Sequence, residues 1–142
     1  MSEAIKSIET MNADNVISKE TKLFGLIGEK AGTSHLFSMI NRLIKSESAD
    51  AMIIPMNIRE DDFYFTVANM KKSHVSGAYI EKEFQETVLD LLDFKDEIVE
   101  VYHRCDFVLK EGEKLKGFLL EKNDVSSQEE LSKIIFEQIV KD

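Results

Sequence analysis

TKLFGLIGEKAGTSHLFSMIN, residues 21–41, joins an apolar run that closes on glycine to an amphipathic run. Residues 23–28 are apolar at nearly every position, which is typical of a strand buried on both faces of a parallel sheet. Thr33 or Ser34 is a suitable N-cap for a helix, because apolar residues recur after it at helical spacing. These residues are Leu36, Phe37, Ile40, Leu43 and Ile44. The stretch predicts a buried strand followed by a helix.

The next seventy residues continue this alternation of strand and helix. Residues 51–58 predict a second strand, in which Pro55 must lie at an edge or a bulge because it cannot donate to a ladder. A helix is predicted over 59–73, a strand over 74–80 and another helix over 81–94. The stripe that predicts this last helix consists of Phe84, Val88, Leu91 and Leu92.

The C-terminal part of the chain predicts strands and a final helix. Residues 97–124 alternate and turn at Glu111-Gly112, which indicates strands joined by a hairpin. Ser127 and Glu130 have capping-box spacing ahead of an apolar stripe. The stripe consists of Leu131, Ile134, Ile135 and Ile139. We therefore expect an α/β fold, a three-layer sandwich with a mostly parallel sheet, helices on both faces and right-handed crossovers.

Composition limits the domain organisation and the partners. The chain has 142 residues, 43% of them hydrophobic, which is enough for the core of one domain. We interpret residues 1–20 as a leader or short helix and residues 21–142 as a single module. The formal charge of −9 and a longest basic run of only Lys71-Lys72 argue against nucleic acid and anionic membrane as partners. Cys105 is the sole cysteine, and no apolar run approaches the roughly 18 residues of a membrane span, so we expect a cytoplasmic protein.

Two stretches resemble the signature stretches of the substrate-binding domain of shikimate dehydrogenases. They are residues 21–41 and residues 76–93, SGAYIEKEFQETVLDLLD. Gly25 and Gly28 keep the family's first strand, and the second stretch keeps its frame without a gap through Gly77, Glu86, Leu92 and Asp93. The resemblance covers roughly residues 18–125. It implies the fold of that family's N-terminal domain.

The resemblance also implies where a substrate would bind. Ser34 falls on the first serine of the family's pair, Leu36 on the second, and Asn41 on the asparagine of a His-Asn step. The asparagine and threonine that hold the substrate hydroxyls fall on Cys105 and Glu81. Tyr79 and Phe84 stand where the pocket wall would be, and two interpretations stay open: they line the pocket or they fill it.

The proton-handling residues of the family are replaced in this sequence. The catalytic lysine falls on Gln85, which cannot titrate, and its aspartate partner falls on Glu121. Lys82 is a candidate for a displaced ammonium, but a lysine in a charged run is more typical of a solvated surface. No GxGxxG turn, phosphate loop or Cys/His metal spacing occurs, so we expect no catalytic residue, no nicotinamide cofactor and no metal.

Two of the substrate-binding positions have plainer structural interpretations. Ser34 is favoured as an N-cap over a ligand hydroxyl, and Cys105 as a small core residue over a reactive nucleophile. Glu81 would place negative charge beside an anionic ligand.

Three functional hypotheses follow. The first is a non-catalytic module that binds a small hydroxy-carboxylic acid or a protein partner. The second is one half of a split shikimate/quinate-type oxidoreductase whose cofactor-binding domain is a separate chain. The third is a homodimer that pairs through the helix over 127–141.

Overall fold

Within the described residues the sheet is mixed and has six strands in the order β2-β1-β3-β5-β6-β4. The structure is a computed structural model that describes residues 21–121 and 127–141, so the predicted leader over 1–20 lies outside the described residues. The strands are β1 (Lys22–Gly28), β2 (Ala51–Asn57), β3 (Gly77–Ile80), β4 (Phe94–Lys95), β5 (Phe107–Glu111) and β6 (Lys114–Phe118). Strand β1 is parallel to β2 and β3, and β4 is parallel to β6. Among these six described strands, β5 alone runs antiparallel to its neighbours, β3 and β6, so the expected mostly parallel α/β sheet is confirmed.

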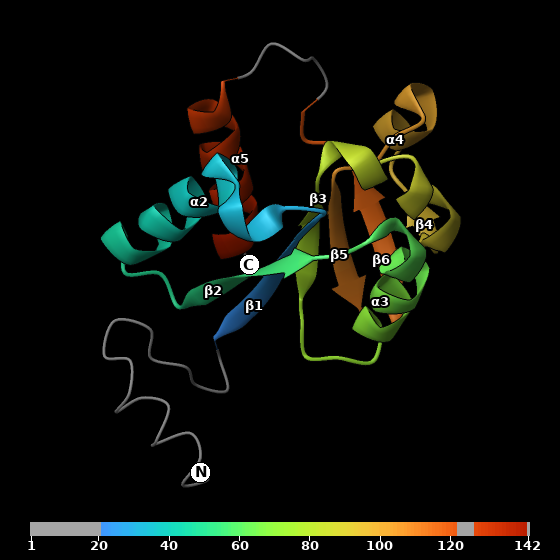
Figure 1. Ribbon diagram of the computed structural model, residues 1–142, viewed down its shortest axis with the longest axis horizontal. Coiled ribbons are helices and arrows are strands. Elements are labelled where there is room, and N and C mark those ends of the chain that lie inside the picture. The colour runs from blue at the N-terminus through green and yellow to red at the C-terminus, as the bar shows by residue number, and fades with distance from the viewer. Residues whose placement is uncertain (1–20, 122–126, 142) are drawn as a thin grey trace, which may run out of the picture.

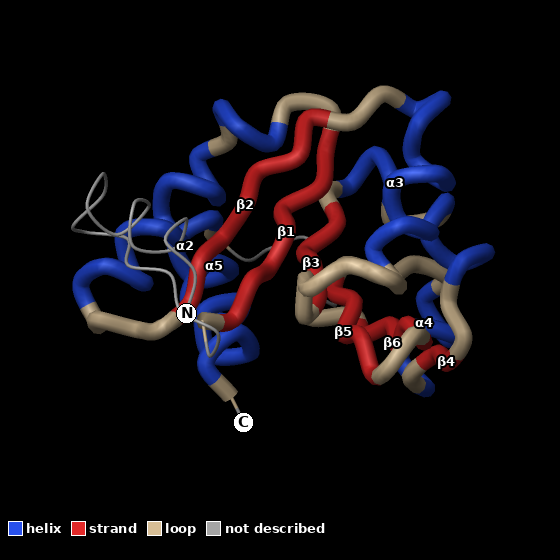
Figure 2. The backbone as a smooth tube through the Cα atoms, turned by 90° about the horizontal axis from the view of Figure 1, so that it is seen from below, coloured by secondary structure: helices blue, strands red, loops and turns tan. Residues whose placement is uncertain are grey.

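Helices cover both faces of this sheet. Figure 1 shows α2 (His35–Ser46) and α5 (Gln128–Val140) together on one side, and α3 (Phe63–Met70) and α4 (Glu97–Tyr102) on the other. The view from below in Figure 2 shows the same separation. Successive residues of β1 supply the two cores, because Leu26 packs under α2 and α5 whereas Ile27 packs under α3. The three layers place the carboxyl ends of β1 and β3 between the two helical sides.

Serine caps start the two long helices as predicted. Ser34 Oγ accepts a hydrogen bond from the Phe37 N–H at 3.1 Å, and Ser127 Oγ accepts one from the Glu130 N–H at 3.1 Å. The predicted stripe of α5 faces the core, with its half-buried member at Ile134. Its buried members are Leu131, Ile135 and Ile139. Helix α5 therefore packs against α2 within its own domain.

The predicted helix over 81–94 is wrong, and the segment forms two short 3₁₀ helices, η3 (Lys82–Phe84) and η4 (Thr87–Leu91). Hydrogen bonds in this segment, such as the one from the Gln85 N–H to Lys82 O, join residues three positions apart, whereas those of an α-helix join residues four apart. The carbonyl of Gln85 accepts its hydrogen bond from the N–H of Cys105, on another segment of the chain. Tertiary pairing thus takes the acceptor that an α-helix would have used.

The predicted strand at the start of 97–124 is also wrong, because Glu97–Tyr102 forms α4. Its β-branched residues predict a strand, but Val99 is the fully buried one, Ile98 packs half-buried against the core, and Val101 is 67% exposed. Acidic residues fill the first turn, where they favour the helix N-terminus, and His103 ends the helix at φ 55°. The later part of the prediction is confirmed, since β5 and β6 form a hairpin whose Gly112 has φ 65°.

Pro55 lies on β2, which forms one edge of the sheet, as its lack of an N–H requires. At the other edge, β4 is only two residues long and is not anticipated by the sequence pattern.

Candidate functional site

A pocket of about 320 Å³ lies at the carboxyl end of β3. In open α/β sheets ligands bind outside the carboxyl ends of the strands, so its position is the usual one for this architecture. Leu36 from α2 and Leu131 from α5 provide an apolar part of its lining. The polar part comes from Tyr79, Glu81, Lys82, Glu83, Glu121 and Gln128. We call this cavity the Tyr79 pocket.

Tyr79 is the most deeply placed polar residue of the pocket, with only 3% of its surface exposed. Its ring belongs to the core under α2 and α5, next to Phe107 on β5. Among residues 21–121 and 127–141 its hydroxyl has no hydrogen-bond partner, and the hydroxyl oxygen is not fully buried. Burial raises the pKa of Tyr79, and the charges of Asp106, Glu121 and Glu81 raise it further, against the guanidinium of Arg104. The hydroxyl therefore faces the cavity as a neutral donor and acceptor.

Glu81 lies at the mouth of the Tyr79 pocket, where β3 ends. Burial raises its pKa first, and the nearby charge of Glu83 raises it further. Gly28 leaves the space that Glu81 occupies, because a Cβ at residue 28 would come within 2.8 Å of Glu81 Oε1. A second cavity of about 400 Å³ lies on the other side of Glu81 and is lined by Ser34. The rest of its lining is Glu29, Lys30, Thr33, Glu81 and Glu83.

Asp106 holds the backbone of the segment that carries Glu121 into the pocket. It is fully buried, and its two carboxylate oxygens accept hydrogen bonds from the N–H groups of Leu120 at 2.7 Å and Glu121 at 2.9 Å. Burial raises the pKa of Asp106, and these two hydrogen bonds counteract the rise. The bonds hold the chain after β6 so that Glu121, 6% exposed, lines the pocket. Asp106 is not among the predicted site residues, although a charged residue directly before the apolar run of β5 is a usable signal.

Gln85 lies below this site and joins two segments. It is 3% exposed, its Nε2 donates to Ile80 O at 2.9 Å, and its Oε1 accepts from Arg104 Nη1 at 3.0 Å. Arg104 also donates through Nη2 to Glu121 O at 2.8 Å. No pattern in the sequence indicates this role of Arg104. The amide at the family's lysine position is thus fixed by internal hydrogen bonds, and Gln85 does not line the pocket.

The other predicted site residues are spread out. Cys105 is fully buried, its Sγ lies 3.4 Å from Phe107 O, and burial raises its pKa to about 12, so the thiol stays protonated at neutral pH. Ser34 is the N-cap of α2 and lines the second cavity. Asn41 is half-buried within α2 and lines neither cavity. Phe84 fills the core against Phe63, with ring centroids 4.5 Å apart, so of the two pocket-wall candidates only Tyr79 lines the pocket.

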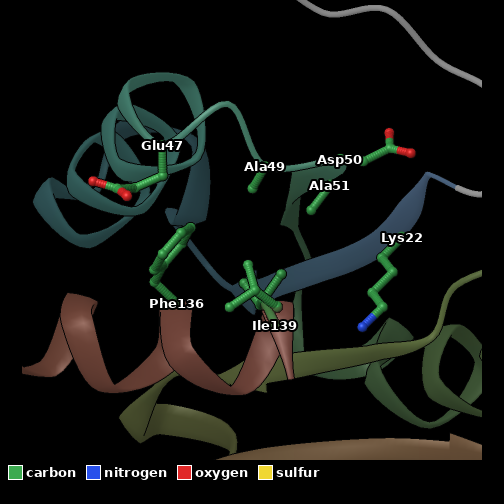
Figure 3. A pocket seen from close by; sticks show the side chains of 8 residues that line it. Lys22, Glu47, Ala49, Asp50, Ala51, Phe136 and Ile139 are labelled. Carbon is green, nitrogen blue, oxygen red and sulfur yellow. The ribbon is translucent and has the colours of Figure 1, made fainter. Parts of the chain in front are cut away.

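A larger cavity of about 440 Å³ lies elsewhere, between the C-terminal half of α5 and the start of β2. Figure 3 shows Phe136 and Ile139 rising from α5 beneath Ala49 and Ala51, with Lys22 at the side. None of the predicted site residues contributes to it. Because the larger cavity lacks these residues and the Tyr79 pocket contains three of them, we favour the Tyr79 pocket as the functional site.

No cluster of three His, Cys, Asp or Glu within the described residues is arranged to hold a metal ion. In the same part of the chain, no helix has the length and apolar character to cross a membrane.

Comparisons with known proteins give a consistent answer. A shikimate dehydrogenase (NADP(+)) of Dictyoglomus turgidum is 29% identical over 102 residues, which are 72% of this chain and 37% of that protein. The crystal structure of shikimate dehydrogenase from Aquifex aeolicus matches with a TM-score of 0.64 and 24% identity, over 71% of this chain and 38% of that one. The chain resembles the N-terminal domain of shikimate dehydrogenases.

The shikimate dehydrogenase-like fold is also found in an enzyme with another name. Ligand-free 5-ketofructose reductase of a Gluconobacter species matches with a TM-score of 0.66 and 18% identity, over 72% of this chain and 37% of that one. No protein-family model matches the chain. The chain spans about 37% of the length of the curated relative from Dictyoglomus turgidum.

Proposed function

We propose that this shikimate dehydrogenase-like domain is a non-catalytic module that binds a small hydroxylated molecule in the Tyr79 pocket. The observation that carries the proposal is the state of Gln85. Both polar ends of its side chain are used in internal hydrogen bonds, while the pocket beside it remains open. The scaffold of a substrate site is retained without the group that would move a proton.

From the resemblance we expect that this chain has lost the proton-transfer step. Oxidation of an alcohol by hydride transfer also releases the hydroxyl proton, and a positioned side chain near neutral pKa must accept it. An amide cannot do so. Glu121 keeps a carboxylate in the pocket, but it has no ammonium at residue 85 to act with.

The test pairs an activity assay with a binding assay on the purified chain. With shikimate or quinate and NADP⁺, we expect no reduction of the nicotinamide, whereas the Aquifex aeolicus shikimate dehydrogenase serves as the active control. In parallel, backbone amide shifts in NMR titrations with small polyols should move at Tyr79 and Glu81. The amides around Phe136 in the larger cavity should stay unchanged. Turnover of shikimate by the chain alone, or polyol shifts confined to the larger cavity, would contradict the proposal.

The split-enzyme hypothesis has one supporting observation, namely that Glu121 lines the Tyr79 pocket at the position that the resemblance gives to the family's aspartate. It is tested by adding a separately purified cofactor-binding domain of a shikimate dehydrogenase to the chain. Hydride transfer only in the mixture would establish it. Its absence, together with no complex in size-exclusion chromatography, would remove it.

A further inference from the structure

We infer that the Tyr79 pocket selects a small hydroxylated amine, a ligand that carries an ammonium group together with hydroxyls, over a hydroxy-carboxylic acid. The inference rests on the proposed function and specifies its ligand class. It is carried by the hydroxyl of Tyr79, which faces the cavity and has no hydrogen-bond partner among the described residues, and by the sign of the charges around it.

The Tyr79 hydroxyl is the first of these observations. A tyrosine that is 3% exposed usually pairs its hydroxyl with a protein group, because a hydroxyl with little access to water needs another hydrogen-bond partner. No such partner exists among the residues that the structure describes, and the residue lines the cavity. A ligand hydroxyl or ammonium in the pocket would supply the missing hydrogen bond.

The charges around the hydroxyl give the second observation. Among the described residues, Glu81, Glu83 and Glu121 line the pocket, Asp106 acts on Tyr79 as a further negative charge, and Lys82 is the basic side chain in the lining. The guanidinium of Arg104 is directed to Gln85 Oε1 and to the backbone oxygen of Glu121. A carboxylate ligand would therefore enter a site of its own sign, whereas an ammonium is attracted and can donate to carboxylate oxygens.

The apolar lining is the third observation. Leu36 stands where the resemblance places a serine hydroxyl for the substrate carboxylate, and Leu131 of α5 also contributes to the lining. The loss of that hydroxyl removes a donor that a carboxylate would need. The two leucines suit the carbon skeleton of a polyol, with its polar groups turned toward Tyr79 and the glutamates.

A matched series of three polyols separates charge from shape. Glucamine, sorbitol and gluconate share a six-carbon polyhydroxyl chain and differ at one terminal carbon, which carries an ammonium, a hydroxyl or a carboxylate. In NMR titrations that follow the amides of Tyr79 and Glu81, glucamine should bind about tenfold more tightly than sorbitol. Gluconate should bind more weakly than sorbitol.

Substitutions in the pocket should change this preference in distinct ways. Glu121→Gln and Glu81→Gln should each reduce the ratio of glucamine to sorbitol affinity, with circular dichroism showing that both variants fold. Tyr79→Phe should weaken glucamine and sorbitol alike, by about threefold to tenfold. Glu60→Gln, on an exposed 3₁₀ turn, removes the same charge away from the pocket and should leave all three affinities unchanged.

Equal affinity for the three polyols, a preference for gluconate, or an unchanged ratio in both glutamate variants would overturn the inference. Sorbitol binding at Tyr79 without an amine preference would overturn this inference and leave the proposed function standing. No shift at Tyr79 and Glu81 with any of the three polyols would overturn both.

Discussion

Replacing Gln85 by lysine should destabilise the protein rather than restore catalysis. Arg104 Nη1 lies 3.0 Å from Gln85 Oε1, so the new ammonium would lie within about 4 Å of a guanidinium. Two like charges at that distance repel by about 4 kcal/mol at an effective dielectric constant of about 20. Arg104 also loses a hydrogen bond worth about 1.5–3 kcal/mol. Lysine can relax or lose its proton, so we expect the free energy of unfolding to fall by about 3 kcal/mol.

Urea unfolding followed by circular dichroism measures this change, and a double-mutant cycle assigns it. The cycle compares Gln85→Lys, Arg104→Gln and the double variant. Contacts of Arg104 to other residues, such as Glu121 O, are lost equally in the single and the double variant, so they cancel. The double variant should be more stable than the sum of the single effects predicts, by about 2 kcal/mol or more.

Two results would refute this reasoning. A Gln85→Lys protein as stable as the parent would show that Arg104 does not hold the amide. Shikimate oxidation by Gln85→Lys, with NADP⁺ as acceptor, would show that the position still faces a substrate.

Three other substitutions or reagents probe the rest of the structure. Because burial raises the pKa of Cys105 to about 12, its thiol should resist iodoacetamide at pH 8 in the native state and react on unfolding in urea; rapid native labelling would contradict its burial. A hydrogen bond from the Leu115 N–H and then the ammonium of Lys71 lower the pKa of Asp93 below 3.8. The stability that the ionised Asp93 adds is therefore complete above that pH and is lost as the pH falls through the lowered pKa. Asp93→Asn should be less stable than the parent at pH 7 and nearly as stable at pH 2 in urea titrations. An equal loss of stability at both pH values would exclude the linkage. Gly77→Ala would drive a Cβ into the backbone of β5, so this variant should fail to fold cooperatively, and a parent-like thermal transition would show that β3 and β5 pair less closely.

The buried strands and the capped helices could be predicted from the sequence, because each has a local cause. The run over 23–28 buries both faces, and Ser34 and Ser127 supply hydrogen bonds to the first turns of their helices. The segment over 81–94 could not be predicted in this way. Its apolar spacing fits an α-helix, but the acceptor at Gln85 is taken by the N–H of Cys105, twenty positions along the chain.

The residues of the candidate site also fall into those that the sequence predicts and those that it does not. The resemblance indicates Tyr79 and Glu81 from the stretch over 76–93 and Glu121 from a count after Gly117, and the three residues line one pocket. Arg104 and Asp106 were missed because their roles depend on hydrogen bonds to groups that only the folded chain brings close. Three of the predicted residues therefore share a pocket, whereas Ser34, Asn41, Gln85 and Cys105 do not line it, and the groups that fix the pocket depend on tertiary structure.

The two edges of the sheet bear on how the protein behaves at high concentration. An uncovered edge strand can recruit the edge of another molecule and start a growing stack. On one side the imino acid of β2 interrupts the row of donors, and on the other β4 offers two residues, too few for a stable foothold. At high concentration, molecules of this domain should therefore not associate through the edges of their sheets, and both edge strands favour colloidal stability.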